Sequence, residues 1–161
     1  MASAHIQSGD IATFAVMVDG KAVPDELSVY SVFIEKFAES HFCRVFEKKC
    51  RGKQWEITVK AIKEMLTRYD NLVVGNKSNS SKLDIICLCG EYTIIKLDFS
   101  IAGSNVSAKS SGNRVVAAVD SNKKIIKILL VYSKNDIGPP NETVRWKNMI
   151  AQYYEEFKKL K

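Results

Sequence analysis

The pattern of apolar positions divides the chain into strands and helices that alternate in a simple order. Apolar residues recur near helical spacing across residues 36–49 and 55–69, which predicts two helices separated by a break at Arg51-Gly52. Strands are predicted at residues 27–34, 83–88, 92–99, 115–119 and 125–132, with a last helix from residues 141–143 to about 157. This order predicts an α+β fold, with helices on one side of a twisted, mainly antiparallel sheet of about five strands.

The last two predicted strands bring distant parts of the chain together. A short polar turn, SNKK, joins residues 115–119 to residues 125–132, so the two segments are expected to form an antiparallel hairpin. The outer ends of such a hairpin lie side by side. The preceding strand, YTIIKLDF at residues 92–99, alternates in a way that places Lys96 and Asp98 on one face.

The first part of the chain carries a separate hairpin signal. Residues 13–18, TFAVMV, are followed by Asp19-Gly20, a dipeptide typical of tight turns, and we expect residues 27–34 to be the partner strand. The length of 161 residues suits a single domain, 1–161. Within it, residues 1–26 are interpreted as an N-terminal hairpin extension and residues 27–161 as the main domain.

The net charge of +6 and the pI near 9.1 favour a nucleic acid, an acidic protein or an anionic membrane as partner. A basic soluble protein without a polyanionic partner is the alternative. No stretch approaches the roughly 20 apolar residues of a membrane helix, so we expect no membrane contact. The first residues lack the basic and apolar regions of a secretory signal, which predicts a cytoplasmic protein or one delivered by another route.

The four cysteines do not predict a metal site. Cys43, Cys50, Cys87 and Cys89 have spacings that match no common zinc pattern, and His41 is the only histidine near them. Reduced, unbonded thiols are expected instead. Glycine-rich phosphate-binding motifs are also missing from the sequence, so neither a metal nor a small-molecule cofactor is expected.

The residues that flank the hairpin are rich in cations and hydroxyl groups. They are Lys109, Ser110, Ser111, Asn113 and Arg114 before the first strand, and Tyr132 and Lys134 at the end of the second. Their position predicts that they surround one anion. RNA cleavage by attack of the 2′-hydroxyl requires a base, cations that stabilise the phosphate, and an acid. Because His5 lies in the extension and His41 on a helix, a lysine or tyrosine would have to transfer the proton.

Two short segments carry a resemblance to a known family. KSSGNRVV at residues 109–116 resembles the K-S-G-G-x-R-V-I segment of RelE/ParE-like toxins, and ILLVYSKND at residues 128–136 resembles their L-L-x-x-Y-x-K-x-(D/E) strand. The tail at residues 141–154 resembles the terminal helix of one branch of the family. The resemblance implies a RelE-like fold and the toxin of a type II toxin–antitoxin system. Such a toxin is a ribosome-associated mRNA endonuclease that needs no metal or small-molecule cofactor, and its partners are an antitoxin protein, mRNA and the ribosome.

The resemblance also implies roles for individual residues. Lys109 and Arg114 would stabilise the phosphate, Lys96 would abstract a proton or bind phosphate, and Tyr132 would transfer a proton or stack on a base. The expected RNA-binding residues are Ser110, Ser111, Asn113 and Lys134. The chain departs from the family pattern at Ser111-Gly112, where many relatives have two glycines, and at Asp98, near a position often occupied by arginine.

Three other functions are compatible with the sequence. A ParE-like protein shares the fold and poisons DNA gyrase instead of cleaving RNA. A non-catalytic module that binds RNA or protein would keep the basic face and lack a titratable group with a perturbed pKa. An assembly or adaptor protein would act through the N-terminal hairpin, with the basic loop incidental.

Overall fold

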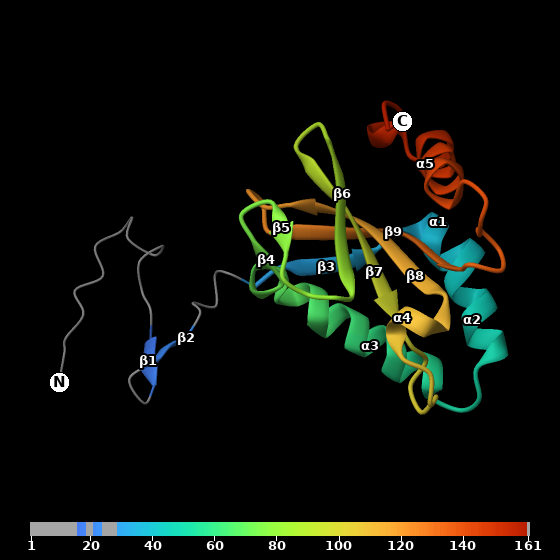
Figure 1. Ribbon diagram of the computed structural model, residues 1–161, viewed down its shortest axis with the longest axis horizontal. Coiled ribbons are helices and arrows are strands. Elements are labelled where there is room, and N and C mark those ends of the chain that lie inside the picture. The colour runs from blue at the N-terminus through green and yellow to red at the C-terminus, as the bar shows by residue number, and fades with distance from the viewer. Residues whose placement is uncertain (1–15, 19–20, 24–28, 161) are drawn as a thin grey trace.

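The computed structural model describes residues 16–18, 21–23 and 29–160, and its main body is built on a five-stranded sheet (Figure 1). The strands of this sheet are β3 (Ser31–Ile34), β6 (Leu83–Cys89), β7 (Tyr92–Phe99), β8 (Asn113–Asp120) and β9 (Ile125–Ser133). Their order is β3-β9-β8-β7-β6, with β3 parallel to β9 and every other pair antiparallel. The predicted α+β class with a mainly antiparallel five-stranded sheet is confirmed.

The helices before residue 68 and after residue 141 occupy predicted stretches of sequence, whereas a short helix at residues 108–111 was not predicted. They are α1 (Lys36–Ala38), the π-helical η3 (Glu39–Cys43), α2 (Arg44–Lys49), α3 (Gln54–Thr67), α4 (Ala108–Ser111), α5 (Glu142–Tyr153) and the 3₁₀ turns η4 (Tyr69–Asn71) and η5 (Glu155–Phe157). The first three follow one another directly and form a single helical segment. A short hairpin of β4 (Val73–Val74) and β5 (Lys77–Ser78) precedes β6.

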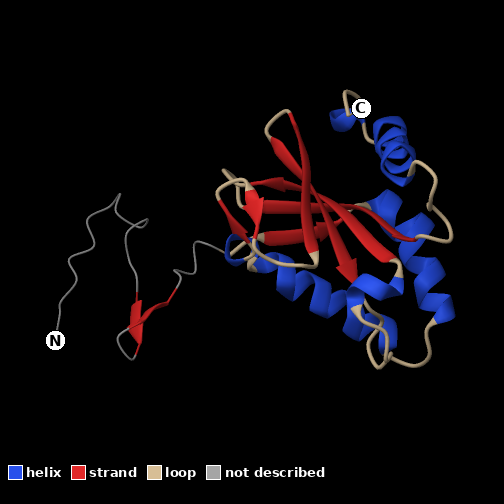
Figure 2. Cartoon of the chain, in the orientation of Figure 1, coloured by secondary structure: helices blue, strands red, loops and turns tan. Residues whose placement is uncertain are grey.

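Helices cover both faces of the sheet, so the predicted one-sided arrangement is wrong. Trp55, Ile62 and Leu66 of α3 pack in one core cluster, whereas Trp146 and Ile150 of α5 pack in a second cluster on the other face. In Figure 2 the α3 helix lies below the sheet and α5 above it. The physical reason is in β8, which is buried from residue 114 to residue 120 and alternates between the two clusters. A strand that is apolar on both sides needs cover on both sides.

One extra residue in β9 changes how many of its side chains pack in each of the two core clusters. Val116 pairs with Leu130 and Ala117 with Ile128, which leaves Leu129 as a bulge between them. Ile128 belongs to the α3 side, while Leu129 and Leu130 both belong to the α5 side. The bulge therefore adds apolar surface to the face that α5 covers.

The N-terminal hairpin has a different partner from the predicted one. Here β1 (Val16–Val18) pairs antiparallel with β2 (Lys21–Val23), and residue 18 lies opposite residue 21. The predicted partner, residues 27–34, is wrong: β3 joins the main sheet beside β9, where the Ser31 N–H donates to the Lys124 carbonyl at 2.9 Å. Residues 13–15, 19–20 and 27–28 lie outside the described residues.

The structure also describes the cysteines, possible metal ligands and the apolar character of the helices. All four cysteines are unbonded. Within residues 16–18, 21–23 and 29–160, no group of three or more histidine, cysteine or carboxylate side chains is arranged to hold a metal ion. No helix in the same part of the chain has the length and apolar character needed to cross a membrane.

Candidate functional site

The three central strands bring two of the predicted site residues, Arg114 and Tyr132, into one row with Asp98. Asp98 on β7 lies opposite Arg114 on β8, and Arg114 lies opposite Tyr132 on β9. Strand alternation puts these residues, together with Lys96, on the face that α5 covers. The hairpin geometry therefore places residues from three strands side by side at one end of the sheet.

Arg114 is buried, with 4% of its surface exposed, and its guanidinium is engaged within the protein. Its Nε lies 2.9 Å from Asp98 Oδ1, Nη1 donates to the Asn113 carbonyl at 2.9 Å, and Nη2 donates to the Lys109 carbonyl at 3.5 Å. Arg114 was expected to stabilise a phosphate, and in the structure its guanidinium faces the Asp98 carboxylate across the strand pair. Arg114 instead fixes the loop that carries Lys109.

Asp98 is the partner that the sequence interpretation did not include in the site. Burial raises the pKa of its carboxyl group above the ordinary value, and the nearby Arg114 and Lys96 act in the opposite direction. Its Oδ1 receives no aligned hydrogen bond in spite of the short distance to Arg114. The sequence did carry one signal that Asp98 belongs to the site. Asp98 lies two residues after Lys96 on a predicted strand, and this spacing places both side chains on one face.

Tyr132 is fully buried and holds the start of α5. Its hydroxyl donates to Glu142 Oε1 at 2.7 Å. Burial and the adjacent Glu142 carboxylate raise the pKa of the phenol far above its ordinary value, so the hydroxyl stays protonated. The resemblance implied that Tyr132 transfers a proton or stacks on a base, and in the structure its ring is buried and its hydroxyl is bound to Glu142. The cause is the position of α5, which packs on this face of the sheet.

Replacing Tyr132 with phenylalanine is expected to lower the free energy of unfolding by about 1.5 kcal/mol, because it removes a hydrogen bond to a charged group and leaves the half-buried Glu142 without that donor. Urea denaturation measures the effect. Tyr153→Phe is the matched control, since Tyr153 is an exposed tyrosine on α5, the helix that carries Glu142. Equal effects of the two substitutions would show that the Tyr132 hydroxyl does not stabilise the fold.

The loop before β8 is ordered by its own hydroxyl groups. Ser107 caps α4 by accepting from the Ser110 N–H at 3.2 Å. Ser111 Oγ lies 2.6 Å from two carbonyl oxygens, those of Phe99 and Ala108, and accepts from the Asn113 N–H at 3.0 Å. Ser111 therefore has a local structural task. Ser110 is exposed and Asn113 is half-buried.

Three lysines lie near the Asp98–Arg114 pair, and we refer to Lys96, Lys109 and Lys134 as the lysine cluster. Lys96 and Lys134 act electrostatically on Asp98, and the Lys109 backbone carbonyl accepts from Arg114. Lys109 and Lys134 are exposed, and neither forms an ion pair with another residue in the described part of the chain. The Lys134 N–H donates to the Gly112 carbonyl at 2.8 Å, which ties the end of β9 to the loop. Lys96 is 21% exposed and lies 3.6 Å from Asp84.

Gly112 shapes the contact between these two segments. Its φ of +75° ends α4 in the left-handed conformation that glycine adopts without strain. A Cβ at this position would lie 3.6 Å from Lys134 Cβ, so the Lys134 stem already passes close to the glycine. The hydrogen bond from the Lys134 N–H to the Gly112 carbonyl holds the two basic segments together.

His41 is nearer to this end of β9 than the sequence interpretation assumed. It is exposed on η3, packs against Phe37 with ring centroids 4.3 Å apart and planes tilted by 34°, and its Nδ1 lies 3.1 Å from the Phe37 carbonyl. With Lys49 and Asp136 it lines a small cavity of about 150 Å³. Asp136 belongs to the turn that follows Lys134, so a histidine stands beside the turn after β9.

A scan against protein-family models, a search of curated proteins and a search of solved structures each found no match. The resemblance to RelE/ParE-like toxins therefore rests on the motifs at residues 109–116 and 128–136 and on the order of the elements. The roles of individual residues in RNA binding or cleavage are predictions that follow from the chemistry of the site.

Proposed function

We propose that the chain is the toxin of a type II toxin–antitoxin pair and acts in the cytoplasm as a metal-independent, ribosome-associated mRNA endonuclease. The observation that supports this proposal is the lysine cluster around the buried Asp98–Arg114 pair. Lys109 and Lys134 form no ion pair within residues 29–160, and lysines of this kind bind phosphates and release counterions from RNA. An antitoxin protein would hold the enzyme inactive by covering the same face.

The arrangement supports a revised division of roles. Lys109 and Lys134 are exposed and are assigned to the phosphates of the RNA chain. Lys96, which is partly buried on the same face as Asp98, is assigned to phosphate binding at the cleaved bond or to proton transfer. Arg114 is a positioning residue, because its donors hold Asp98 and the carbonyl groups of the loop rather than a ligand.

A second candidate function is a non-catalytic RNA-binding module. The specific observation in its favour is that the Arg114 guanidinium and the Tyr132 hydroxyl are both engaged internally. Such a module would bind RNA through the lysines and leave it intact. The gyrase-poison and adaptor functions are further alternatives, and the experiment below separates all four.

Induction of the gene in bacteria, with growth followed in parallel with primer extension on a reporter mRNA, tests the proposal. The endonuclease predicts growth arrest with new mRNA ends, and a Lys96→Met variant should produce fewer ends while the protein still accumulates. Growth arrest with DNA damage and unchanged mRNA would favour the gyrase poison. Unaffected growth would reject both toxins, and purified protein that then binds RNA without cutting it would favour the binding module over an adaptor.

The double substitution Lys109→Glu/Lys134→Glu is expected to weaken binding to a single-stranded RNA by at least about tenfold, because two phosphate contacts become repulsive. The slope of log affinity against log salt should become shallower by about 1.4, from about 0.7 for each phosphate contact. Filter binding over a range of salt measures both quantities. Lys48→Glu/Lys60→Glu is the control, since it makes the same charge change at exposed positions on α2 and α3. Equal losses in both variants would mean that net charge, and not this face, binds RNA.

A further inference from the structure

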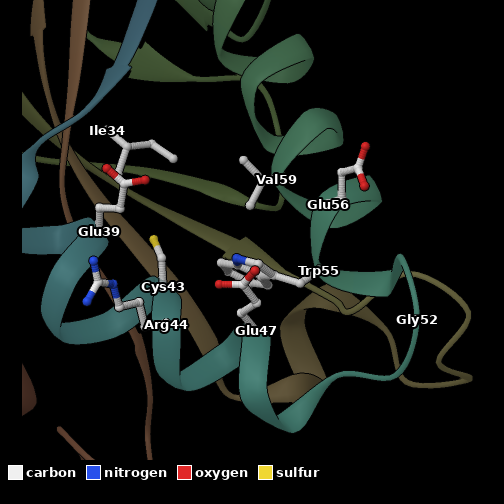
Figure 3. Close-up of a pocket in the computed structure, with 9 residues that line it drawn as sticks. All are labelled: Ile34, Glu39, Cys43, Arg44, Glu47, Gly52, Trp55, Glu56 and Val59. Carbon is white, nitrogen blue, oxygen red and sulfur yellow. The ribbon is translucent and has the colours of Figure 1, made fainter.

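A groove of about 400 Å³ lies between the η3–α2 segment and α3 (Figure 3). Its lining is apolar at the base and charged around the edge. The apolar residues are Ile34, Cys43, Trp55 and Val59, and the charged residues are Glu39, Arg44, Glu47 and Glu56. We refer to it as the acidic groove.

The helical spacing of these residues makes the groove regular. Glu39, Cys43 and Glu47 follow one another at intervals of four, so they form one stripe along η3 and α2. Trp55 and Val59 are also four apart and form the facing wall on α3. Figure 3 shows the two walls facing each other across the groove. Two helix walls with an apolar base are the geometry into which a third amphipathic helix packs.

The base of the groove is rigid. Trp55 is buried and stacks against Phe46 with ring centroids 4.9 Å apart and planes 9° from parallel. Cys43 is buried beside it, and burial raises the pKa of its thiol to about 11, so it behaves as a neutral apolar group. A ligand that enters the groove therefore meets a fixed apolar surface.

The charge of the groove is opposite to that of the whole chain. Three glutamates and one arginine line it, while the chain carries a net charge of +6. In the described part of the protein, Glu39, Glu47 and Glu56 form no ion pair with a lysine or arginine. These free carboxylates repel RNA and attract cationic side chains.

We propose that the acidic groove binds a basic amphipathic helix of a partner protein. The apolar side chains of that helix, spaced at i, i+3 or i+4 and i+7, rest on Trp55 and Val59. Lysines or arginines on its flanks pair with Glu39 and Glu47 on one wall and Glu56 on the other. This inference is independent of the proposed function at the lysine cluster, because it uses a different surface with the opposite charge.

Selection from a display library of short helix-forming peptides against the full chain tests the proposal. We expect the enriched peptides to carry apolar residues at helical spacing with lysine or arginine beside them. The most enriched peptide is then measured by calorimetry, and its site is mapped from backbone amide shifts. Shifts should concentrate in residues 39–47 and 55–59.

Charge reversal in the groove provides the decisive variant. Glu47→Lys/Glu56→Lys should weaken binding of the selected peptide at least about tenfold, because two attractions become repulsions. Glu64→Lys/Glu91→Lys is the matched control, since it makes the same charge change at exposed positions that do not line the groove. Thermal midpoints confirm that both variants are folded.

Several results would overturn the proposal. The first two are a selection that enriches no peptide and a selection whose enriched peptides lack basic residues. The other two are equal losses of binding in the groove variant and its control, and amide shifts centred on Lys109 and Lys134. Sedimentation gives a further test of the occupant. If the chain is a dimer that Glu47→Lys/Glu56→Lys dissociates and the control does not, the groove binds a second copy and the partner-helix proposal is wrong.

Discussion

Replacing Arg114 with alanine is expected to lower the free energy of unfolding by about 3–5 kcal/mol, because it leaves a buried carboxylate without its cation. The Arg114 Nε lies 2.9 Å from Asp98 Oδ1, and both side chains are buried. The substitution also removes the two donors that hold the Asn113 and Lys109 carbonyl groups. Denaturant unfolding measures the loss. Lys134→Ala, an exposed lysine beside the same pair, should change stability by less than about 0.5 kcal/mol.

The loss in Arg114→Ala should depend on pH. Burial already raises the pKa of Asp98, and Arg114 is the largest influence that lowers it, so removing Arg114 raises this pKa further. A carboxyl group whose pKa is higher in the folded than in the unfolded protein binds more protons when folded, so its contribution to stability increases as pH falls through the folded pKa. The variant should therefore be least stable, relative to the parent, at neutral pH and should recover part of the difference in acid.

A double variant distinguishes a lost ion pair from lost packing. If the unpaired Asp98 carboxylate causes most of the destabilisation, Asp98→Leu/Arg114→Leu should be more stable than Arg114→Ala, because neither side chain then carries a buried charge. A double variant as unstable as the single one, together with a loss that does not change with pH, would contradict this explanation. The hydrogen bonds from Arg114 to the loop would then be the main contribution.

This result also bears on how Arg114 is tested in the proposed endonuclease. A variant that loses several kcal/mol of stability loses activity for that reason alone, so Arg114→Ala cannot by itself assign a role in RNA cleavage. Lys96→Met is the better test, since Lys96 is partly exposed and its ion pair with Asp84 at 3.6 Å is near the surface. Removal of such a pair leaves the fold nearly unchanged.

Replacing Trp146 with alanine is expected to lower the free energy of unfolding by about 3–5 kcal/mol, through lost burial and the cavity that remains. Trp146 is fully buried on α5 and packs in the core cluster with Ile94, Tyr132 and Phe157. Because α5 is the main cover of this face, we also expect a rise in the binding of a hydrophobic dye when the helix loosens. Thermal and urea unfolding followed by circular dichroism measure the effect.

Val144→Ala is the matched control for Trp146→Ala. Val144 lies on the same helix with 57% of its surface exposed, so its substitution tests helix content without removing core contacts. We expect a change within about 0.5 kcal/mol. A loss for Trp146→Ala no larger than that of the control would mean that α5 does not stabilise the sheet, and that the second core cluster does not contribute to the fold.

Local patterns in the sequence determined the main elements of this fold. The strand predicted at residues 92–99 has the same limits as β7, and the helix predicted at residues 55–69 corresponds to α3 at residues 54–67. The hairpin of residues 115–119 and 125–132 corresponds to β8 and β9. Its polar turn and apolar strands also determined that the outer ends of the hairpin lie side by side. The bulge at Leu129 then sets Arg114 opposite Tyr132. These predictions depend on residues that are close in sequence, where turn chemistry and periodicity act directly.

Only the tertiary structure decided which of these residues reach solvent. Asp98 meets Arg114, and Glu142 meets Tyr132, so a strand pairing and the docking of α5 bury two side chains that the motifs placed on the surface. The parallel pairing of β3 with β9 joins segments some 90 residues apart, where the sequence carried a stronger local signal for a hairpin. Such contacts depend on how whole elements pack against one another. A local pattern specifies an apolar face, but the element that covers that face is selected by the packing of the complete chain.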